Sequence, residues 1–295
     1  MGSIDKLKVG DSIGIFSPST PITYSCPKRF KRAIKYLQDK GFKIILGKLT
    51  EKHDFYRSGT IKERAEELND LIRNPEVRCI MSTIGGMNSN SLLPYIDYEA
   101  FKRDPKIIIG YSDVTAILLA IYAQTGISTY YGPALVASFG ELPPFVDDTY
   151  QYFAEIAMDN PMTPYVFGTP KYWTDEYINW EAQERSKEKR ENQWLTVYDG
   201  VVRGRVIGGN LDTIQGIWGS KYMPQIKKGD LLFIEDSLKD CAIIERSFSL
   251  LKVNGVFDQI SGIILGKHEL FDDLKTGRRP YEILVEVLGD QKLPF

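Results

Sequence analysis

Along the first 125 residues, short apolar runs alternate with longer stretches in which apolar side chains return every three or four positions. The short runs, which are typical of strands, lie at residues 12–17, 42–47, 79–86 and 106–109. The stretches with helical periodicity follow them at residues 27–40, 61–73, 92–101 and 114–123. Alternating strands and helices predict a parallel sheet with helices on both faces. In such sheets, ligands bind at the carboxyl ends of the strands.

The pattern changes after Tyr130. Residues 130–148 are rich in proline and glycine and predict a loop, and residues 149–158 predict a helix that no strand precedes. The segment 164–200 carries tyrosines and tryptophans around the charged run EAQERSKEKREN. This composition predicts an exposed arm on a second domain.

Strand-like runs return at residues 200–210, 229–237 and 261–269, and an apolar-faced helix is predicted at 243–253. The fold class is therefore α/β, with an N-terminal parallel sheet flanked by helices and a C-terminal mainly β domain with helices. We place the N-terminal domain at residues 1–160, an arm or linker at 161–200 and the C-terminal domain at 201–295.

Composition excludes several classes of protein. Of the 295 residues, 43% are hydrophobic and 26% are charged, which excludes a disordered or collagen-like chain. The 37 Lys and Arg residues nearly balance 39 Asp and Glu, so no net field draws the chain to nucleic acid or to a membrane. Three scattered cysteines and two histidines form no metal motif, so we expect reduced thiols and neither metal nor cofactor. The N-terminus lacks signal-peptide features and no apolar run reaches the ~18 residues of a membrane span, which predicts a cytoplasmic location.

The sharpest local signal is Gly110-Tyr111-Ser112-Asp113, which joins a strand-like run to the start of an apolar helix. A serine on such a turn projects its hydroxyl above the sheet, and the helix N-terminus offers N–H groups to a developing oxyanion. The sequence is not G-x-S-x-G, however, and serine before aspartate is also a common helix N-cap. From the spacing alone, Ser112 is either a nucleophile or an N-cap.

Glycine turns follow two other predicted strands. Gly85-Gly86 can let the backbone approach a ligand and supply half of an oxyanion hole. Gly208-Gly209-Asn210 has the same character, and its asparagine offers both a donor and an acceptor. Either segment also fits an ordinary turn.

Charged and titratable residues end two strands of the second half. Glu235 and Asp236 are adjacent, so strand alternation directs their side chains to opposite faces and excludes a carboxylate dyad. One of them can orient a base, and the other can cap the next turn. His268 also ends a strand, and that position would let it serve Ser112.

With these residues in view, the chain resembles the serine peptidase family that contains muramoyl-tetrapeptide L,D-carboxypeptidases and microcin C immunity peptidases. The matching stretches span nearly the whole chain in the family's order: SIGIFSPSTPIT, FYRSGTIKERAEELNDLI, IMSTIGGMNSNSLLPYID, IIIGYSDVTAILL, GRVIGGNLDTIQGIWGS, LLFIEDS and ERSFSLLKVNGVFD. The aromatic arm with Trp173 and Trp180, and the turn GGMNSN, are closer to the microcin immunity branch.

The resemblance implies a Ser-His-Glu triad in which Ser112 is the nucleophile and Glu235 orients the histidine. It implies an oxyanion hole formed by the backbone N–H groups of Gly86 and Asp113.

The resemblance also implies residues that bind substrate. Trp180, with Tyr172 or Trp173, would stack on a nucleobase, and Asn210 and Lys239 would hold the aminoacyl and phosphoramidate part. The alternative for the tryptophans is a dimer contact or local packing of the arm.

One departure from the family bears on activity. The family's catalytic histidine lies in a His-x-x-Pro-type segment well downstream of the glutamate, and this sequence ends at Lys292-Leu293-Pro294-Phe295 without one. We therefore expect a shortened C-terminal domain and a missing general base. His268 matches a different position of the family and is the alternative base.

These observations predict a serine hydrolase, without metal or cofactor, that cleaves an amide in microcin C-type peptidyl- or aminoacyl-nucleotides and so confers toxin immunity. The alternatives are an L,D-carboxypeptidase acting on murein tetrapeptide and an inactive form that only binds nucleotide. The expected partner is the small nucleotide-linked substrate, with neither nucleic acid nor membrane, and the family implies a homodimer.

Overall fold

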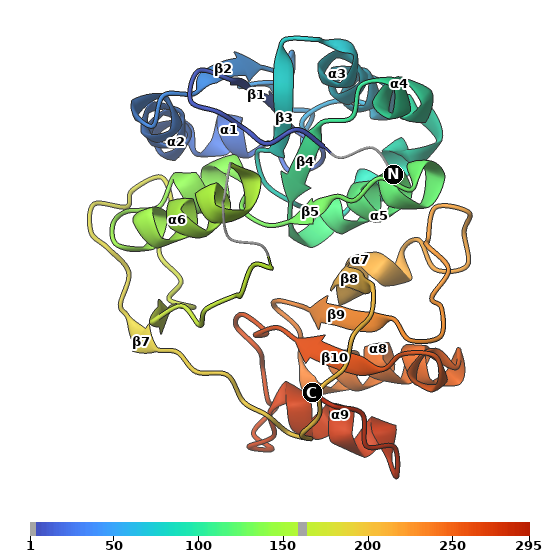
Figure 1. The fold of residues 1–295 in the computed structure, drawn as a ribbon. Coiled ribbons are helices and arrows are strands. Elements are labelled where there is room, and N and C mark those ends of the chain that lie inside the picture. The colour runs from blue at the N-terminus through green and yellow to red at the C-terminus, as the bar shows by residue number, and fades with distance from the viewer. Residues whose placement is uncertain (1–3, 159–163) are drawn as a thin grey trace. The chain divides into compact units, whose positions relative to one another are not determined.

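The chain divides into two compact units, residues 1–193 and 194–295. The computed structural model describes residues 4–158 and 164–295. Figure 1 labels the elements of both units along the chain.

The N-terminal unit is built on a five-stranded parallel sheet. Its strands are β1 (Ser12–Phe16), β2 (Lys43–Leu46), β3 (Val77–Ser82), β4 (Ile107–Gly110) and β5 (Tyr130–Tyr131). They lie in the order β2-β1-β3-β4-β5, so the direction in which strands are added reverses between β1 and β3. In open parallel sheets, ligands bind beside such a reversal, at the carboxyl ends of the strands.

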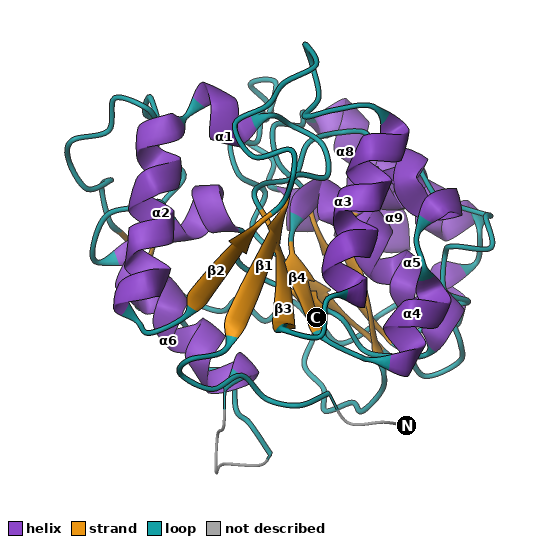
Figure 2. Cartoon of the chain, turned by 90° about the horizontal axis from the view of Figure 1, so that it is seen from above, coloured by secondary structure: helices purple, strands orange, loops and turns teal. Residues whose placement is uncertain are grey.

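Helices cover both faces of this sheet, as the sequence predicts. They are α1 (Ile22–Ser25), α2 (Pro27–Asp39), α3 (Ile61–Arg73), α4 (Tyr98–Arg103), α5 (Thr115–Thr125) and α6 (Phe145–Ala157), with short helical turns η1 (Ser89–Tyr95) and η2 (Ser112–Val114). In Figure 2, α2 and α6 lie on one side of the strands, and α3, α4 and α5 lie on the other. The alternating pattern therefore predicts the layers correctly.

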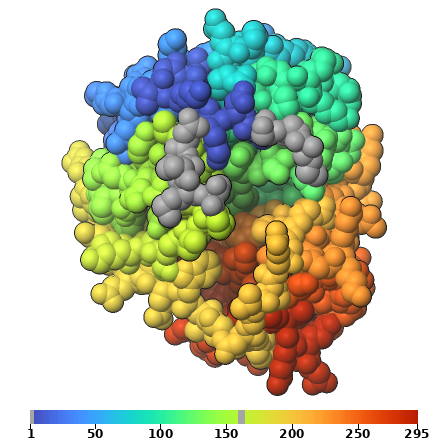
Figure 3. Space-filling model, in the orientation of Figure 1, coloured from blue at the N-terminus to red at the C-terminus, as the bar shows by residue number. Residues whose placement is uncertain are grey.

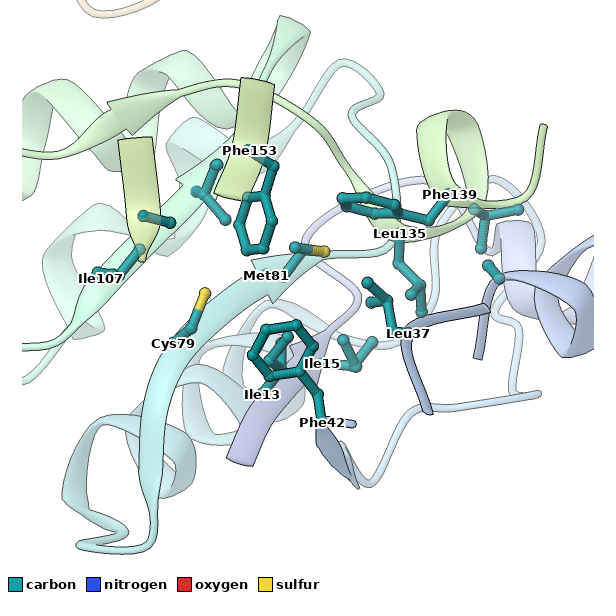
Figure 4. Close-up of a cluster of buried hydrophobic side chains, with 14 of the residues drawn as sticks. Ile13, Ile15, Leu37, Phe42, Cys79, Met81, Ile107, Leu135, Phe139 and Phe153 are labelled. Carbon is teal, nitrogen blue, oxygen red and sulfur yellow. The ribbon is translucent and has the colours of Figure 1, made fainter. Parts of the chain in front are cut away.

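The main core lies between the sheet and the α2–α6 side. Ile13 and Ile15, two positions apart on β1, point into it because successive strand side chains alternate between faces. Figure 4 shows them beside Leu37, Phe139 and Phe153, which come from the surrounding helical segments. All five side chains are buried.

The predicted loop at residues 130–148 contains a buried helical turn instead. Residues Leu135–Phe139 (η3) form a single turn of π-helix, and Leu135, Val136 and Phe139 have no exposed surface. Proline and glycine on both sides gave the segment a loop signal, but its apolar residues pack on the core. The following helix, α6, begins at Phe145 rather than at residue 149.

The aromatic segment after α6 clusters with the N-terminal unit as far as Gln193, whereas the sequence suggested an arm on a second domain. Its short strands β6 (Tyr172–Trp173) and β7 (Arg190–Glu191) pair antiparallel. In the space-filling view, the yellow-green segment lies on the surface of its unit, beside the green residues of α6 (Figure 3). Gln183 is nevertheless buried, and its side-chain oxygen accepts a hydrogen bond from the Arg29 guanidinium of α2.

The C-terminal unit contains a three-stranded parallel sheet, in the order β10-β9-β8. Its elements are β8 (Val206–Asn210), α7 (Leu211–Gln215), β9 (Leu231–Glu235), α8 (Cys241–Val253), η4 (Val256–Asp258), β10 (Gly262–Leu265) and α9 (Pro280–Leu288). Gly208 on β8 has a φ of +151°, and a Cβ there would lie 1.6 Å from the carbonyl oxygen of Phe233 on β9. Only glycine fits this approach between the strands.

The predicted α/β class is confirmed, but the C-terminal unit is a parallel sheet with helices rather than the mainly β domain that the sequence suggested. None of the helices within the described ranges is both long and apolar enough to cross a membrane.

Candidate active site

Ser112 occupies the turn that joins β4 to α5, and its backbone is left-handed with a φ of +59°. Few residues other than glycine adopt this conformation, and it is typical of strained functional turns. Ser112 is not an N-cap: Tyr111 precedes η2, Val114 precedes α5, and neither helix has a side-chain cap. The backbone N–H of Ser112 donates to the Tyr131 hydroxyl at 2.9 Å, which ties the turn to β5. The geometry is that of a nucleophile elbow.

The glycine turn after β3, Gly85-Gly86, lies directly against Ser112. A Cβ at Gly85 would come within 2.8 Å of the Ser112 Cβ and 3.1 Å of the Asp113 nitrogen. Gly86 has a φ of +148°, and a Cβ there would meet the Ser19 hydroxyl at 2.2 Å. These close approaches require glycine at both positions, and Gly85 places the turn that contains Gly86 against Ser112 and Asp113.

The Asp113 side chain has a second role that the sequence did not reveal. Its carboxylate is buried and accepts the backbone N–H groups of Asn88 at 3.0 Å and Ser89 at 2.9 Å. These bonds cap the start of η1 and join the glycine turn to the serine turn. Burial raises the pKa of the Asp113 carboxyl, while the backbone donors act in the opposite direction.

Glu235 lies at the end of β9 in the C-terminal unit, within hydrogen-bond reach of Asn210. The Asn210 amide nitrogen donates to Glu235 Oε1 at 3.0 Å and to Asp236 Oδ1 at 3.3 Å. Burial alternates across the end of β9, since Glu235 is half-buried and Asp236 is buried, as expected for adjacent side chains that point to opposite faces. Asp236 accepts the Asp212 N–H at 3.1 Å at the start of α7. Burial raises the pKa of Asp236.

Asn210 and Lys239, the two predicted substrate-binding residues of this unit, both have partners within the protein. Asn210 is buried and caps α7 through its side-chain oxygen, which accepts the Thr213 N–H at 3.0 Å. The Lys239 ammonium pairs with the Asp212 carboxylate at 2.7 Å and keeps 18% of its side chain exposed. Both therefore lie in one polar cluster with Glu235, at the carboxyl end of the small sheet.

The two histidines occupy different surroundings. His268 follows β10 and lies between the rings of Phe248 and Phe271, and its Nδ1–H donates to the Gly266 carbonyl at 3.2 Å. Its Nε2 is buried without a partner among the described residues, and burial lowers its pKa to about 4. These contacts resemble those of a neutral core histidine. His53, in the other unit, stacks on Tyr24 with ring centres 3.9 Å apart.

Trp180 packs against the core of the N-terminal unit, and the Arg29 guanidinium lies 4.2 Å from its ring centre. Arg29 is fully buried and pairs with Glu141 at 3.0 Å. The indole therefore has one face covered by a fixed cation.

Tyr172 lies elsewhere on the same segment, on the β6–β7 hairpin. The ammonium groups of Lys171 and Lys189 each lie 5.1 Å from its ring centre. No contact between Tyr172 and Trp180 is found among the described residues, so the structure does not bring together the two aromatic residues that were predicted to bind the base.

Within residues 4–158 and 164–295, no group of three or more His, Cys, Asp or Glu side chains is arranged to hold a metal ion. The N-terminal unit places the strained Ser112 beside the backbone of the Gly85-Gly86 turn and the backbone nitrogen of Asp113. This arrangement can attack a carbonyl carbon and receive an oxyanion.

Comparison with known proteins identifies the family. Residues 13–132 match the LD-carboxypeptidase N-terminal domain and residues 203–295 match the LD-carboxypeptidase C-terminal domain. The second match shows that the C-terminal domain is present.

Two curated relatives align along almost the whole chain. A Vibrio cholerae protein described as a carboxypeptidase is 59% identical over 98% of this chain and 86% of its own length. The microcin C7 self-immunity protein of Escherichia coli is 58% identical over 98% of this chain and 84% of its own length.

A solved structure of the microcin C7 self-immunity protein, free of ligand, superposes with a TM-score of 0.94 at 57% identity and covers 98% of this chain and 87% of that one. Other structures of that protein contain aspartyl sulfamoyl adenosine or glutamyl sulfamoyl guanosine. With both domains matched and close relatives along its length, the chain belongs to the LD-carboxypeptidase family of serine-peptidase-like hydrolases.

Proposed function

We propose that this protein hydrolyses the bond between the acyl group and the nucleotide part of microcin C-type aminoacyl-nucleotides, and so protects the cell that makes it. The left-handed Ser112, seated against the Gly85-Gly86 turn, is the observation that carries the reaction type. The 58% identity to the microcin C7 self-immunity protein supports the choice of substrate.

In the proposed reaction, the Ser112 hydroxyl oxygen attacks the acyl carbonyl carbon and gives its proton to a base. The N–H groups of Gly86 and Asp113 stabilise the oxyanion of the tetrahedral intermediate. The carbon–nitrogen bond then breaks, the leaving nitrogen takes up the proton, and an ester to Ser112 remains. A water molecule attacks this ester, which releases the acid and restores the serine hydroxyl.

Glu235 is proposed to orient the histidine that acts as base. Asn210 supports this role by donating to the Glu235 carboxylate, which fixes the side chain. Asn210 and Lys239 are also proposed to contact substrate. A variant of the Escherichia coli protein in which an active-site serine, asparagine and lysine are replaced by alanine supports these three residue types.

Trp180 is the proposed nucleobase platform, with Tyr172 as a further aromatic contact. The Arg29 cation supports this assignment, because it lies over one face of the indole and holds the ring in place. We also propose that the protein acts as a homodimer in the cytoplasm. The three free cysteines are consistent with a reducing compartment, and sedimentation at several concentrations tests the dimer.

The first experiment incubates the chain with aspartyl sulfamoyl adenosine and follows the products by mass spectrometry. A parallel sample carries the residues of the Escherichia coli relative that lie outside the aligned region, and Ser112→Ala serves as the control for each. We expect release of aspartate by the extended form and loss of at least about 1000-fold in rate in its Ser112→Ala variant.

Three other outcomes are informative. Cleavage by both forms means that His268 or another group of this chain acts as the base. Binding without cleavage in either form favours a protein that sequesters nucleotide. Cleavage of murein tetrapeptide alone would contradict the proposed substrate and favour an L,D-carboxypeptidase; the murein tetrapeptide carboxypeptidase of Pseudomonas aeruginosa is a relative at 23% identity.

A further inference from the structure

Ser19, in the loop after β1, contacts the Gly85-Gly86 turn. Its side chain is 1% exposed. The hydroxyl oxygen accepts the backbone N–H groups of Met87 at 3.0 Å and Asn88 at 3.2 Å, and the hydroxyl donates to the Asn88 side-chain oxygen at 2.9 Å. A Cβ at Gly86 would fall 2.2 Å from this same oxygen. The hydroxyl is therefore in contact with the backbone that carries the proposed Gly86 donor.

A buried arginine, Arg64, hydrogen-bonds the same Asn88 side chain that Ser19 contacts. Arg64 of α3 is 1% exposed, and its guanidinium donates to the Asn88 side-chain oxygen at 2.7 Å. The same nitrogen donates to the carbonyl of Pro18 at 2.5 Å, one residue before Ser19. The loops after β1 and β3 are thus held together at the place where the strand order reverses.

The two proposed oxyanion donors are positioned in different ways. The Asp113 N–H belongs to the Ser112 turn, which β4 and α5 hold from both sides. Gly86 has no side chain, so no side-chain contact of its own can fix the direction of its N–H. Because an oxyanion hole works through donors that are already oriented, some other group must fix this turn.

We propose that Ser19 is a positioning residue for the hydrolysis, and that it fixes the direction of the Gly86 N–H toward the oxyanion. This inference rests on the proposed function. Ser19 touches neither the substrate nor the attacking serine in this assignment, and it acts through the Met87 and Asn88 amides. Its loss should therefore lower stabilisation of the transition state and leave substrate binding intact.

The test compares Ser19→Ala with Ser58→Ala in the hydrolysis of aspartyl sulfamoyl adenosine. Ser58 is a matched control: it is 2% exposed, and its hydroxyl donates to the Ser17 carbonyl at 2.6 Å rather than to the glycine turn. We expect Ser19→Ala to lower kcat about 10-fold with KM within about two-fold, and Ser58→Ala to leave kcat unchanged within about two-fold. An unchanged kcat in Ser19→Ala, or equal losses in both variants, would overturn the proposal.

Hydrogen exchange provides a readout that does not need turnover. Peptides that cover residues 84–90 should exchange faster in Ser19→Ala than in the parent chain, because the Met87 amide loses its acceptor and the Asn88 amide keeps only the Asp113 carboxylate. Ser58→Ala should leave them unchanged. If no form cleaves the nucleotide, the proposed function has failed, and equal exchange of these peptides in the parent and Ser19→Ala would then refute the positioning role as well.

Discussion

Glu67 is a carboxylate buried beneath the loops that follow β1 and β2. It is 2% exposed and accepts the backbone N–H groups of Ser17 at 2.6 Å and Leu49 at 2.7 Å. Burial raises its pKa to about 7, although the two backbone donors favour the charged form. At neutral pH the fold therefore contains a carboxyl group that is close to half protonated.

This carboxyl should make stability depend on pH. Because its pKa is higher in the folded chain than the ordinary 4.5, the folded chain binds the extra proton, and stability is lost as pH rises from about 4.5 to 7. The contribution is roughly 3 kcal/mol. Glu67→Gln, which imitates the protonated group, should abolish this loss. Urea unfolding of both chains at pH 5 and pH 7.5 measures it, and parallel pH profiles would contradict the pKa.

Residue-scale chemistry was only partly predictable. The turn around Ser112 could be identified because strand, turn and helix are adjacent in sequence. Ser19, Asn88 and Arg64 could not, because their contacts join residues 24 to 69 positions apart.

At the scale of elements, the polar, charged segment from β6 to β7 is held to helix α2 by side-chain hydrogen bonds. Its charged run predicts solvent exposure, and most of the run is exposed. Gln183 is the exception, because it accepts a bond from Arg29 at 2.6 Å and from Arg32 at 3.1 Å. The Gln183 amide therefore ties the segment to α2, together with the Glu181 carboxylate, which accepts the Lys28 N–H at 2.9 Å. Composition alone does not indicate these contacts.

The anchoring gives Trp180 a defined place, and nucleotide binding should depend on it. Trp180→Ala should weaken the binding of adenosine monophosphate about 10-fold, since stacking of a base on an aromatic ring contributes roughly 1–3 kcal/mol. Trp194→Ala is the control, because Trp194 is a tryptophan of the same aromatic segment, is 64% exposed and is not assigned to the base. Calorimetry measures both affinities. Equal losses in the two variants would show that the segment as a whole matters rather than the Trp180 ring.

The strands and long helices followed from sequence because their periods are regular. β1 is buried at every position and α5 is apolar all round, and both patterns are unambiguous. The π-helix at Leu135–Phe139 was missed because one irregular turn has no period of its own. Its burial depends on packing with α2 and α6, which only the folded chain supplies.

At the scale of the whole molecule, the family's two domains occur as two α/β units, each with a parallel sheet. The sequence predicts their order and the overall α/β class, and it sets the aromatic segment apart as an arm or linker, most of which clusters with the first unit. The carboxyl ends of strands carry the proposed chemistry in both units: Ser112 and the glycine turn in the first, and Glu235 with Asn210 in the second. This distribution follows from parallel strands, whose ends gather at one edge of a sheet.

The left-handed backbone of Ser112 has a consequence for the fold as a whole. A serine held at a φ of +59° costs about 1 kcal/mol or more that glycine would not incur. Ser112→Gly should therefore melt above Ser112→Ala, by a few degrees in calorimetry, although both variants lack the hydroxyl. Equal melting temperatures would mean that the turn is unstrained. If the difference is found, the backbone of Ser112 lowers the stability of the fold, and the protein retains this strained turn because the proposed reaction needs the serine hydroxyl.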